Sequence, residues 1–233
     1  MSGPCRFRAD SRPVWCDHGS VIARRTLDRA FWNLHARTWD DELARRERSD
    51  RIARLAPLLP SGGRVVDLGC GTGSYARDLA AAGFDVVGVD FAAAMLERAR
   101  TDTEAEFVEA DLDRELPFGD ATFDGALCVY ALQCVHDPHL FLAEAGRIVR
   151  PGGAFLAVVV APGARPVRPR RARLGTYAFW LAKGAIARTN AVRRYTAAEA
   201  RALLDAAGFA VVDERPATNG TELLARYEPN TAR

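Results

Sequence analysis

The chain has 233 residues, 48% of them apolar and 27% charged, which is the composition of a folded protein with one sizeable core and not of a disordered chain. Its formal net charge of +2, from 32 basic and 30 acidic groups, gives no electrostatic reason to expect nucleic acid. No segment approaches the roughly 18 apolar residues of a membrane helix, and the start lacks the apolar region of a secretory signal, so we expect a cytoplasmic protein without a membrane partner.

The first part of the chain is predicted to be a loose tail followed by helices. Residues 1–19 mix Pro, Gly, Ser and Arg without periodicity and are expected to be a flexible tail. Apolar residues then recur at helical spacing in two segments within 20–58, and Pro57 ends the second of them. We expect residues 20–58 to form a helical cap on a single domain that covers 20–233.

After this cap, short apolar strands alternate with helices of about ten residues. The strands are predicted at 64–69, 84–90, 105–112, 123–130, 152–161, 209–214 and 221–228. The helices are predicted at 74–83, 92–100, 138–150 and 196–208, the last with a capping box formed by Thr196 and Glu199. This alternation predicts an α/β fold with a mostly parallel sheet covered on both faces. Such sheets bind ligands at the carboxyl ends of their strands.

A glycine-rich turn follows the first predicted strand, in the sequence VVDLGCGTGSYA. Gly69 and Gly71 match the start of the dinucleotide fingerprint G-x-G-x-x-G, but Ser74 occupies the place of its third glycine. The P-loop pattern also fails, because no Gly-Lys-Ser/Thr follows. The nearby carboxylate of Asp67 repels anions and attracts cations. The turn therefore favours a ligand with a cationic group over a phosphate-rich one.

The turn and the segments after it resemble the ordered motifs of class I S-adenosylmethionine-dependent methyltransferases, of the small-molecule, methyltransferase domain 11-like type. The later segments are VVGVDFAAAMLERAR, EADLDRELPF, FDGALCVYALQCVHDP, LAEAGRIVRPGGAFLAVV and YTAAEARALLDAAGFAVVDE. The resemblance covers about residues 60–160 and 195–227. It implies a Rossmann-like, doubly wound sheet of seven strands with the last one antiparallel, and S-adenosyl-L-methionine as the cofactor.

The resemblance also implies which residues hold the cofactor. Asp67 would bind the methionine ammonium group, and Asp90 would accept hydrogen bonds from both ribose hydroxyls. Asp111 would bind the adenine amino group. The other residues expected to line the cofactor are Gly69, Cys70, Gly71, Gly73, Phe91, Met95, Leu112, Cys128 and Val129. Met95 is equally well interpreted as a core residue of its helix.

Two histidines, His136 and His35, are the candidates for a catalytic base. Methyl transfer from a sulfonium depends mainly on alignment and the exclusion of water, so a base matters only if the acceptor must lose a proton. Many relatives carry a histidine slightly earlier in the turn after the fourth strand, where this chain has Gln133 and Cys134. His136 is therefore also interpreted as a surface residue of the turn, and His35 as a packing residue.

Acceptor specificity is expected in the helical cap and in a lid insertion at 161–190. Trp39, Tyr177 and Trp180 are predicted to bind the acceptor in an apolar pocket, although the aromatic residues of the insertion also fit an amphipathic helix packed on the sheet. The arginine-rich run at 165–173 fits an anionic acceptor, RNA or a solvated loop.

The sequence thus predicts a methyltransferase that acts on O, N or S of a small apolar or aromatic metabolite, in a tailoring step of secondary metabolism. Two alternatives stay open: an RNA or protein methyltransferase of the same fold, and a protein that uses the cofactor structurally, such as a cyclase. The glycine spacing disfavours a nicotinamide oxidoreductase. The spacing of the five cysteines forms no zinc pattern, so no metal is expected. No nucleic-acid partner is expected, because a single arginine run is the only support for one.

Overall fold

The structure, a computed structural model, describes residues 28–30, 32–34, 36, 44–163 and 193–229. Its elements are α2 (Ala44–Leu55), η2 (Ala56–Leu58), β1 (Arg64–Leu68), α3 (Ser74–Ala81), β2 (Asp85–Asp90), α4 (Ala93–Ala99), β3 (Glu106–Glu109), β4 (Phe123–Val129), η3 (Leu132–Cys134), α5 (Pro138–Ile148), β5 (Val149–Val160), α7 (Ala197–Ala206), β6 (Phe209–Ala217) and β7 (Gly220–Tyr227). None of the helices in these ranges is long and apolar enough to cross a membrane.

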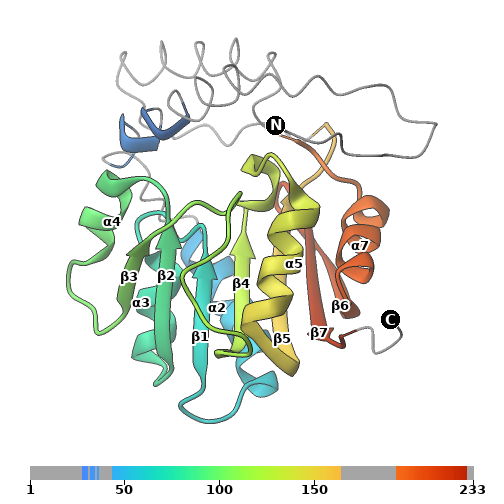
Figure 1. Cartoon of the computed structure of the whole chain (residues 1–233), viewed down its shortest axis with the longest axis horizontal. Coiled ribbons are helices and arrows are strands. Elements are labelled where there is room, and N and C mark those ends of the chain that lie inside the picture. Colours follow the sequence, from blue (N-terminus) through green and yellow to red (C-terminus); the bar gives the residue numbers. More distant parts are fainter. Residues whose placement is uncertain (1–27, 31, 35, 37–43, 164–192, 230–233) are drawn as a thin grey trace, which may run out of the picture.

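One seven-stranded sheet organises the described residues, in the order β3-β2-β1-β4-β5-β7-β6 (Figure 1). The first five strands in this order, β3, β2, β1, β4 and β5, pair in parallel. Only β7 runs against its neighbours, pairing antiparallel with both β5 and β6. The predicted seven-stranded sheet with an antiparallel last strand is therefore confirmed. The parallel strands all end at one edge, and the strand order reverses between β1 and β4, which is where such folds bind ligands.

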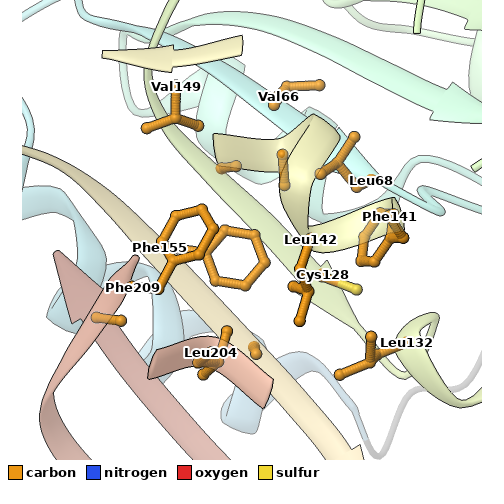
Figure 2. Packing of buried hydrophobic residues seen from close by; sticks show 14 of the residues in the cluster. Val66, Leu68, Cys128, Leu132, Phe141, Leu142, Val149, Phe155, Leu204 and Phe209 are labelled. Atoms are coloured by element: carbon orange, nitrogen blue, oxygen red, sulfur yellow. The ribbon is translucent and has the colours of Figure 1, made fainter. Parts of the chain in front are cut away.

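Helices cover both faces of this sheet. On one face, α5 and α7 pack on a core that includes Phe141, Leu204 and the rings of Phe155 and Phe209, which are tilted by 34° with their centroids 4.6 Å apart (Figure 2). On the other face, α2 and α3 contribute a second core cluster. The members of this second cluster from the two helices are Ile52, Leu55, Ala76 and Leu79. Apolar burial on both faces explains why the strand sequences are almost continuously hydrophobic.

Local sequence signals explain where most elements begin. The capping box is present, with Thr196 accepting from the Glu199 N–H and the Glu199 side chain accepting from the Thr196 N–H. The α5 helix begins at Pro138, and the Asp137 carboxylate caps its first turn. Each of these caps satisfies amide groups that have no partner inside their own helix.

Several predicted boundaries differ from the structure; β6, for example, continues to Ala217, beyond the predicted end at 214. The helix predicted at 138–150 ends at Ile148, because Val149 already pairs with Phe123 of β4 and begins β5. The register then shifts at a bulge, and Gly152 adopts a positive φ of 81° there. The strand predicted at 105–112 is only Glu106–Glu109, since the residues after it leave the sheet at its carboxyl edge.

Candidate functional site

The glycine turn connects β1 to α3 at the carboxyl edge of the sheet. Gly69, Gly71 and Gly73 have φ angles of 81°, 54° and 75°, the left-handed region that other residues rarely adopt. A Cβ on Gly69 would lie only 2.4 Å from the Cβ of Ala131. The connection between β4 and α5 therefore packs directly against the turn, which brings the end of the fourth strand to the same place.

The amide groups of this turn are engaged inside the protein. The N–H groups of Gly69 and Cys70 both donate to the carbonyl of Val89, at 2.8 and 2.9 Å. The N–H of Gly71 donates to Oδ2 of Asp90 at 2.9 Å. A phosphate-binding turn must offer such groups to its ligand. The turn is thus poorly suited to a phosphate, in agreement with the sequence analysis.

Asp67 lies near the end of β1, beneath this turn, and its side chain is 2% exposed. The backbone N–H of Ala76 donates to its carboxylate, but Oδ2 has no hydrogen-bond partner within the part of the chain that the structure describes. Burial, together with the negative charge of Asp90, raises the pKa of Asp67 to about 7. A buried carboxylate with an unpaired oxygen is stabilised by a cationic donor. Oδ2 of Asp67 is therefore an acceptor that a cationic group would pair.

Asp90 ends the adjacent strand β2, and its carboxylate lies between the glycine turn and the turn that connects β2 to α4. Oδ1 accepts from the N–H of Ala92 at 2.9 Å, and Oδ2 accepts from Gly71. Burial is the main cause that raises its pKa, and these backbone hydrogen bonds oppose it. Each carboxylate oxygen has two lone pairs, so this side chain retains acceptor capacity for a ligand. It holds the glycine turn and remains able to bind hydroxyl groups.

Asp111 lies just past the end of β3, so the three carboxylates lie at or near the carboxyl ends of three neighbouring strands. Its Oδ1 accepts from the N–H of Asp113 at 3.0 Å, and the N–H of Ala110 donates to the Asp90 carbonyl at 3.1 Å. Leu112 reaches the glycine turn, where its Cδ1 would lie 3.7 Å from a Cβ on Gly69. The structure thus brings together these residues of the predicted cofactor site.

Other predicted cofactor residues have buried side chains. The sulfur of Cys70 would lie 3.0 Å from a Cβ on Gly88, which places it toward the strand below the turn. Cys128 is fully buried in the core beside Leu132 and Leu142 (Figure 2), and burial raises its pKa to about 12. Its neighbour Val129, the last residue of β4, is partly buried.

Met95 and Phe91 belong to a small cluster beside β2. Met95 is 1% exposed and packs with Ala36 and Trp32 of the N-terminal part of the chain. Phe91 is partly buried at the same cluster, and the guanidinium carbon of Arg29 lies 5.9 Å from its ring centroid. In these contacts Met95 is a core residue, the second of the two interpretations given by its sequence.

His136 lies in the connection between β4 and α5 and is paired with a residue that the sequence analysis missed. Its Nδ1 is 2.8 Å from Oδ2 of Asp113, and its backbone N–H donates to Oδ1 at 2.6 Å. The other ring nitrogen, Nε2, is 3.9 Å from a carboxylate oxygen of Asp28. No motif pointed to Asp113, because its partner is 23 residues away in a different loop.

The remaining predicted residues lie outside the described part of the chain. These are His35, Trp39, Tyr177 and Trp180. The tail at 1–19, the arginine run and most of the 161–190 insertion also lie outside it.

Sequence reasoning also missed a buried charged cluster around Arg51 of α2. Arg51 is 2% exposed and donates to Oε1 of Glu222 at 2.6 Å, to the hydroxyl of Tyr75 at 2.7 Å and to Oε2 of Glu47 at 2.9 Å. Arg54 donates to the other oxygen of Glu222 at 2.6 Å. Arg51 and Glu222 are 171 residues apart, so no local spacing links them.

The close packing of the glycine turn gives a testable expectation for Gly69→Ala. The added methyl group would clash with Ala131, and the alanine would have to keep the positive φ of Gly69. We therefore expect a loss of stability of about 1–3 kcal/mol together with weaker ligand binding. Gly83→Ala is the matched control, because Gly83 also has a positive φ, 91°, but has nothing within 4 Å of its added Cβ. Thermal unfolding of both variants measures the difference, and equal losses would contradict the contact with Ala131.

Comparisons with known proteins agree on one type of domain. Residues 66–157 match the family described as Methyltransferase domain. A demethylmenaquinone methyltransferase of Clavibacter sepedonicus is 39% identical over 111 residues, which cover 46% of this chain and 45% of the relative. A malonyl-[acyl-carrier protein] O-methyltransferase of Pseudescherichia vulneris is 34% identical over 150 residues, which cover 63% and 58%. The chain thus spans about half the length of the curated relatives that it matches.

A solved structure has the same fold. It is that of Burkholderia thailandensis 1,6-didemethyltoxoflavin-N1-methyltransferase with bound 1,6-didemethyltoxoflavin and S-adenosylhomocysteine. The TM-score is 0.66 at 23% identity, and the match covers 97% of this chain and all of that one. At 23% identity, this similarity supports a shared fold alone.

Proposed function

Because residues 66–157 form a methyltransferase domain of the class I S-adenosylmethionine-dependent type, we propose that this protein is a methyltransferase that uses S-adenosyl-L-methionine. The observation that carries the proposal is the buried carboxylate of Asp67, whose Oδ2 has no partner among the described residues. When bound, the cofactor supplies an electrophilic methyl group on a positively charged sulfur. Transfer is an in-line displacement, so the protein acts mainly by alignment and by excluding water.

The carboxylates at the strand ends fit three polar parts of this cofactor. Asp67 binds the ammonium group, which pairs the unsatisfied Oδ2. Asp90 accepts hydrogen bonds from the ribose hydroxyls while it holds the N–H of Gly71. Asp111 binds the adenine amino group beside Leu112. The glycine turn lets the backbone come close to the ligand, since no side chain stands between them.

We infer that the acceptor is a small apolar or aromatic metabolite methylated at O, N or S. Two of the proteins named above act, according to their names, on demethylmenaquinone and on 1,6-didemethyltoxoflavin, which supports a small acceptor. The third is named for a malonyl group on an acyl-carrier protein. The cap at 20–58 and the insertion at 161–190, with Trp39, Tyr177 and Trp180, are the proposed acceptor-binding parts. The composition, rich in Ala, Arg and Gly, agrees with a tailoring step in secondary metabolism.

For an acceptor that must lose a proton, we propose that His136 is the base and that Asp113 orients it. A hydrogen bond from Nδ1–H to Asp113 leaves Nε2 as the nitrogen that accepts a proton. With a phenol as acceptor, His136→Gln is expected to reduce turnover without changing the affinity for S-adenosylhomocysteine. Unchanged turnover would assign His136 a packing role in the loop.

Two measurements test the proposed function. Calorimetric titration with S-adenosylhomocysteine checks that the protein binds the cofactor. Incubation with methyl-labelled S-adenosylmethionine and a panel of phenols, quinols, amines and thiols then detects transfer by mass spectrometry. Absence of binding would overturn the proposal. Transfer to bulk tRNA or a peptide panel, but not to small molecules, would favour the macromolecular alternative, and binding without any transfer would favour a structural use of the cofactor.

A further inference from the structure

We propose that Tyr75 binds the α-carboxylate of the cofactor's methionine portion, and that Arg51 is the positioning residue that holds the Tyr75 hydroxyl for this contact. The inference rests on the proposed function and deepens it. It assigns Tyr75, directly after the glycine turn, and Arg51 of α2, neither of which the sequence analysis placed at the site, and it explains why a buried arginine cluster lies at this edge of the sheet.

The strand register places this cluster on the same face of the sheet as Asp67. One row across the sheet consists of the paired residues Asp67, Leu127, Leu156 and Leu224. The row two residues nearer the carboxyl edge includes the paired residues Val129, Val158 and Glu222. Side chains two residues apart on a strand point to the same face. Glu222, and with it Arg51, therefore lies on the face of Asp67 and one step closer to the edge where a ligand enters.

Tyr75 links the Arg51 cluster to the glycine turn. It is the second residue of α3, directly after the glycine turn, and its neighbour Ala76 donates its N–H to the Asp67 carboxylate. An amino acid carries its ammonium and carboxylate groups on one carbon atom. A residue that binds the carboxylate must accordingly lie next to the residue that binds the ammonium, and Tyr75 meets this condition.

The contact with Arg51 fixes the direction in which the Tyr75 hydroxyl can donate. Its oxygen accepts a hydrogen bond from Arg51 at 2.7 Å, which leaves its own proton available to a ligand. Burial raises the pKa of Tyr75 to about 12, the guanidinium of Arg51 opposes this increase, and the charge of Asp67 adds to it. The hydroxyl is therefore protonated at neutral pH. A neutral donor polarised by a guanidinium suits a carboxylate oxygen.

Arg51 also offsets the negative charges that would repel a carboxylate here. Glu47 and Glu222 both accept hydrogen bonds from it, and Arg54 pairs with Glu222 as well. The guanidinium carbon of Arg51 lies 5.7 Å from the ring centroid of Tyr130, the residue that follows β4. These contacts keep the guanidinium in one place between the helix, the sheet and the turn, so that the position of the Tyr75 hydroxyl is set.

A pair of ligands separates carboxylate binding from a general structural role. Decarboxylated S-adenosylmethionine keeps the sulfonium and the ammonium but lacks the carboxylate. We expect Tyr75→Phe to weaken the calorimetric affinity for S-adenosylmethionine by about tenfold, and to change the affinity for the decarboxylated compound by less than about twofold. Asp67→Asn is expected to weaken the binding of both, because both carry the ammonium.

Two further variants serve as a control for the loss of a tyrosine hydroxyl and as a test of the positioning role of Arg51. Tyr227→Phe is the matched control, since this tyrosine packs on Phe209 in the core and has no part in the proposed contact. Arg51→Lys keeps the charge but loses the forked geometry of the guanidinium. It is expected to weaken S-adenosylmethionine binding while it leaves the decarboxylated compound less affected.

The outcomes that overturn the inference are distinct from failure of the proposed function. If Tyr75→Phe weakens both ligands equally, or weakens neither, Tyr75 does not bind the carboxylate, although the protein remains a cofactor-binding one. If the unaltered protein binds neither ligand, the proposed function is wrong and this assignment fails with it. A loss confined to the ligand that carries the carboxylate supports the assignment.

Discussion

Replacing Asp90 by alanine is expected to weaken the binding of S-adenosylhomocysteine by at least about tenfold. The change removes an acceptor of two charge-assisted hydrogen bonds from the ribose, each of about 1.5–3 kcal/mol. It also leaves the N–H groups of Gly71 and Ala92 without their acceptor, so the glycine turn loses its support. Because tenfold in affinity corresponds to about 1.4 kcal/mol, the loss of even one of these bonds exceeds the resolution of calorimetry.

Asp85→Ala is the matched control for this experiment. Asp85 begins the same strand at the opposite edge of the sheet, where its exposed carboxylate pairs with Arg64 at 3.2 Å. A change there removes the same charge from the same strand without touching the site. An Asp90→Ala protein that unfolds cooperatively and binds with unchanged affinity would remove Asp90 from the cofactor site.

The affinity for S-adenosylhomocysteine is expected to rise with pH between 6 and 8, because Asp67 must be ionised to bind an ammonium group. The pKa of Asp67 in the free protein is about 7, so most molecules carry a proton there at pH 6 and must release it on binding. The affinity is then roughly tenfold weaker at pH 6 than at pH 8. Asp67→Asn is expected to bind weakly at every pH and to remove this dependence.

The same carboxylate is expected to lower the stability of the free protein at neutral and alkaline pH. Its pKa in the folded protein, about 7, is above the ordinary value of 3.8, so its favourable contribution is complete only below about pH 4. That contribution is lost as the pH rises through 7, and amounts to roughly 4 kcal/mol at most. Asp67→Asn should therefore raise the melting temperature more at pH 8 than at pH 5. A variant that is equally stabilised at both values would contradict the raised pKa.

The sequence predicted the sheet and the carboxylates at its edge because both depend on local patterns. Apolar runs separated by turns defined the strands, and the resemblance to the methyltransferase motifs pointed to the acidic residues Asp67 and Asp90 near the ends of two of them. The boundary between α5 and β5 could not be predicted from local patterns. The segment around Val149 continues the apolar pattern of the helix, and only its pairing with Phe123 in the folded sheet makes it a strand.

The charged cluster could not be predicted from the sequence for a different reason. An arginine in a polar helix and a glutamate in a strand are each ordinary surface residues. The Arg51–Glu222 pair is unusual because both side chains are buried, and the sequence does not show that burial. The pair of His136 and Asp113 is a similar case, since the two residues lie in separate loops. Single residues at strand ends are visible in a sequence, whereas pairs formed by the topology are not.

The antiparallel direction of β7 has a consequence for the order in which the molecule assembles. Because β7 runs opposite to its neighbours, Glu222 near its beginning reaches the edge at which the parallel strands end. Arg51 thus has no counter-charge from this strand until the ribosome has passed residue 222. A nascent chain can form α2, β1 and the glycine turn early, but contacts between residues so distant in sequence close late. We expect the competent site to appear in a single late step of folding.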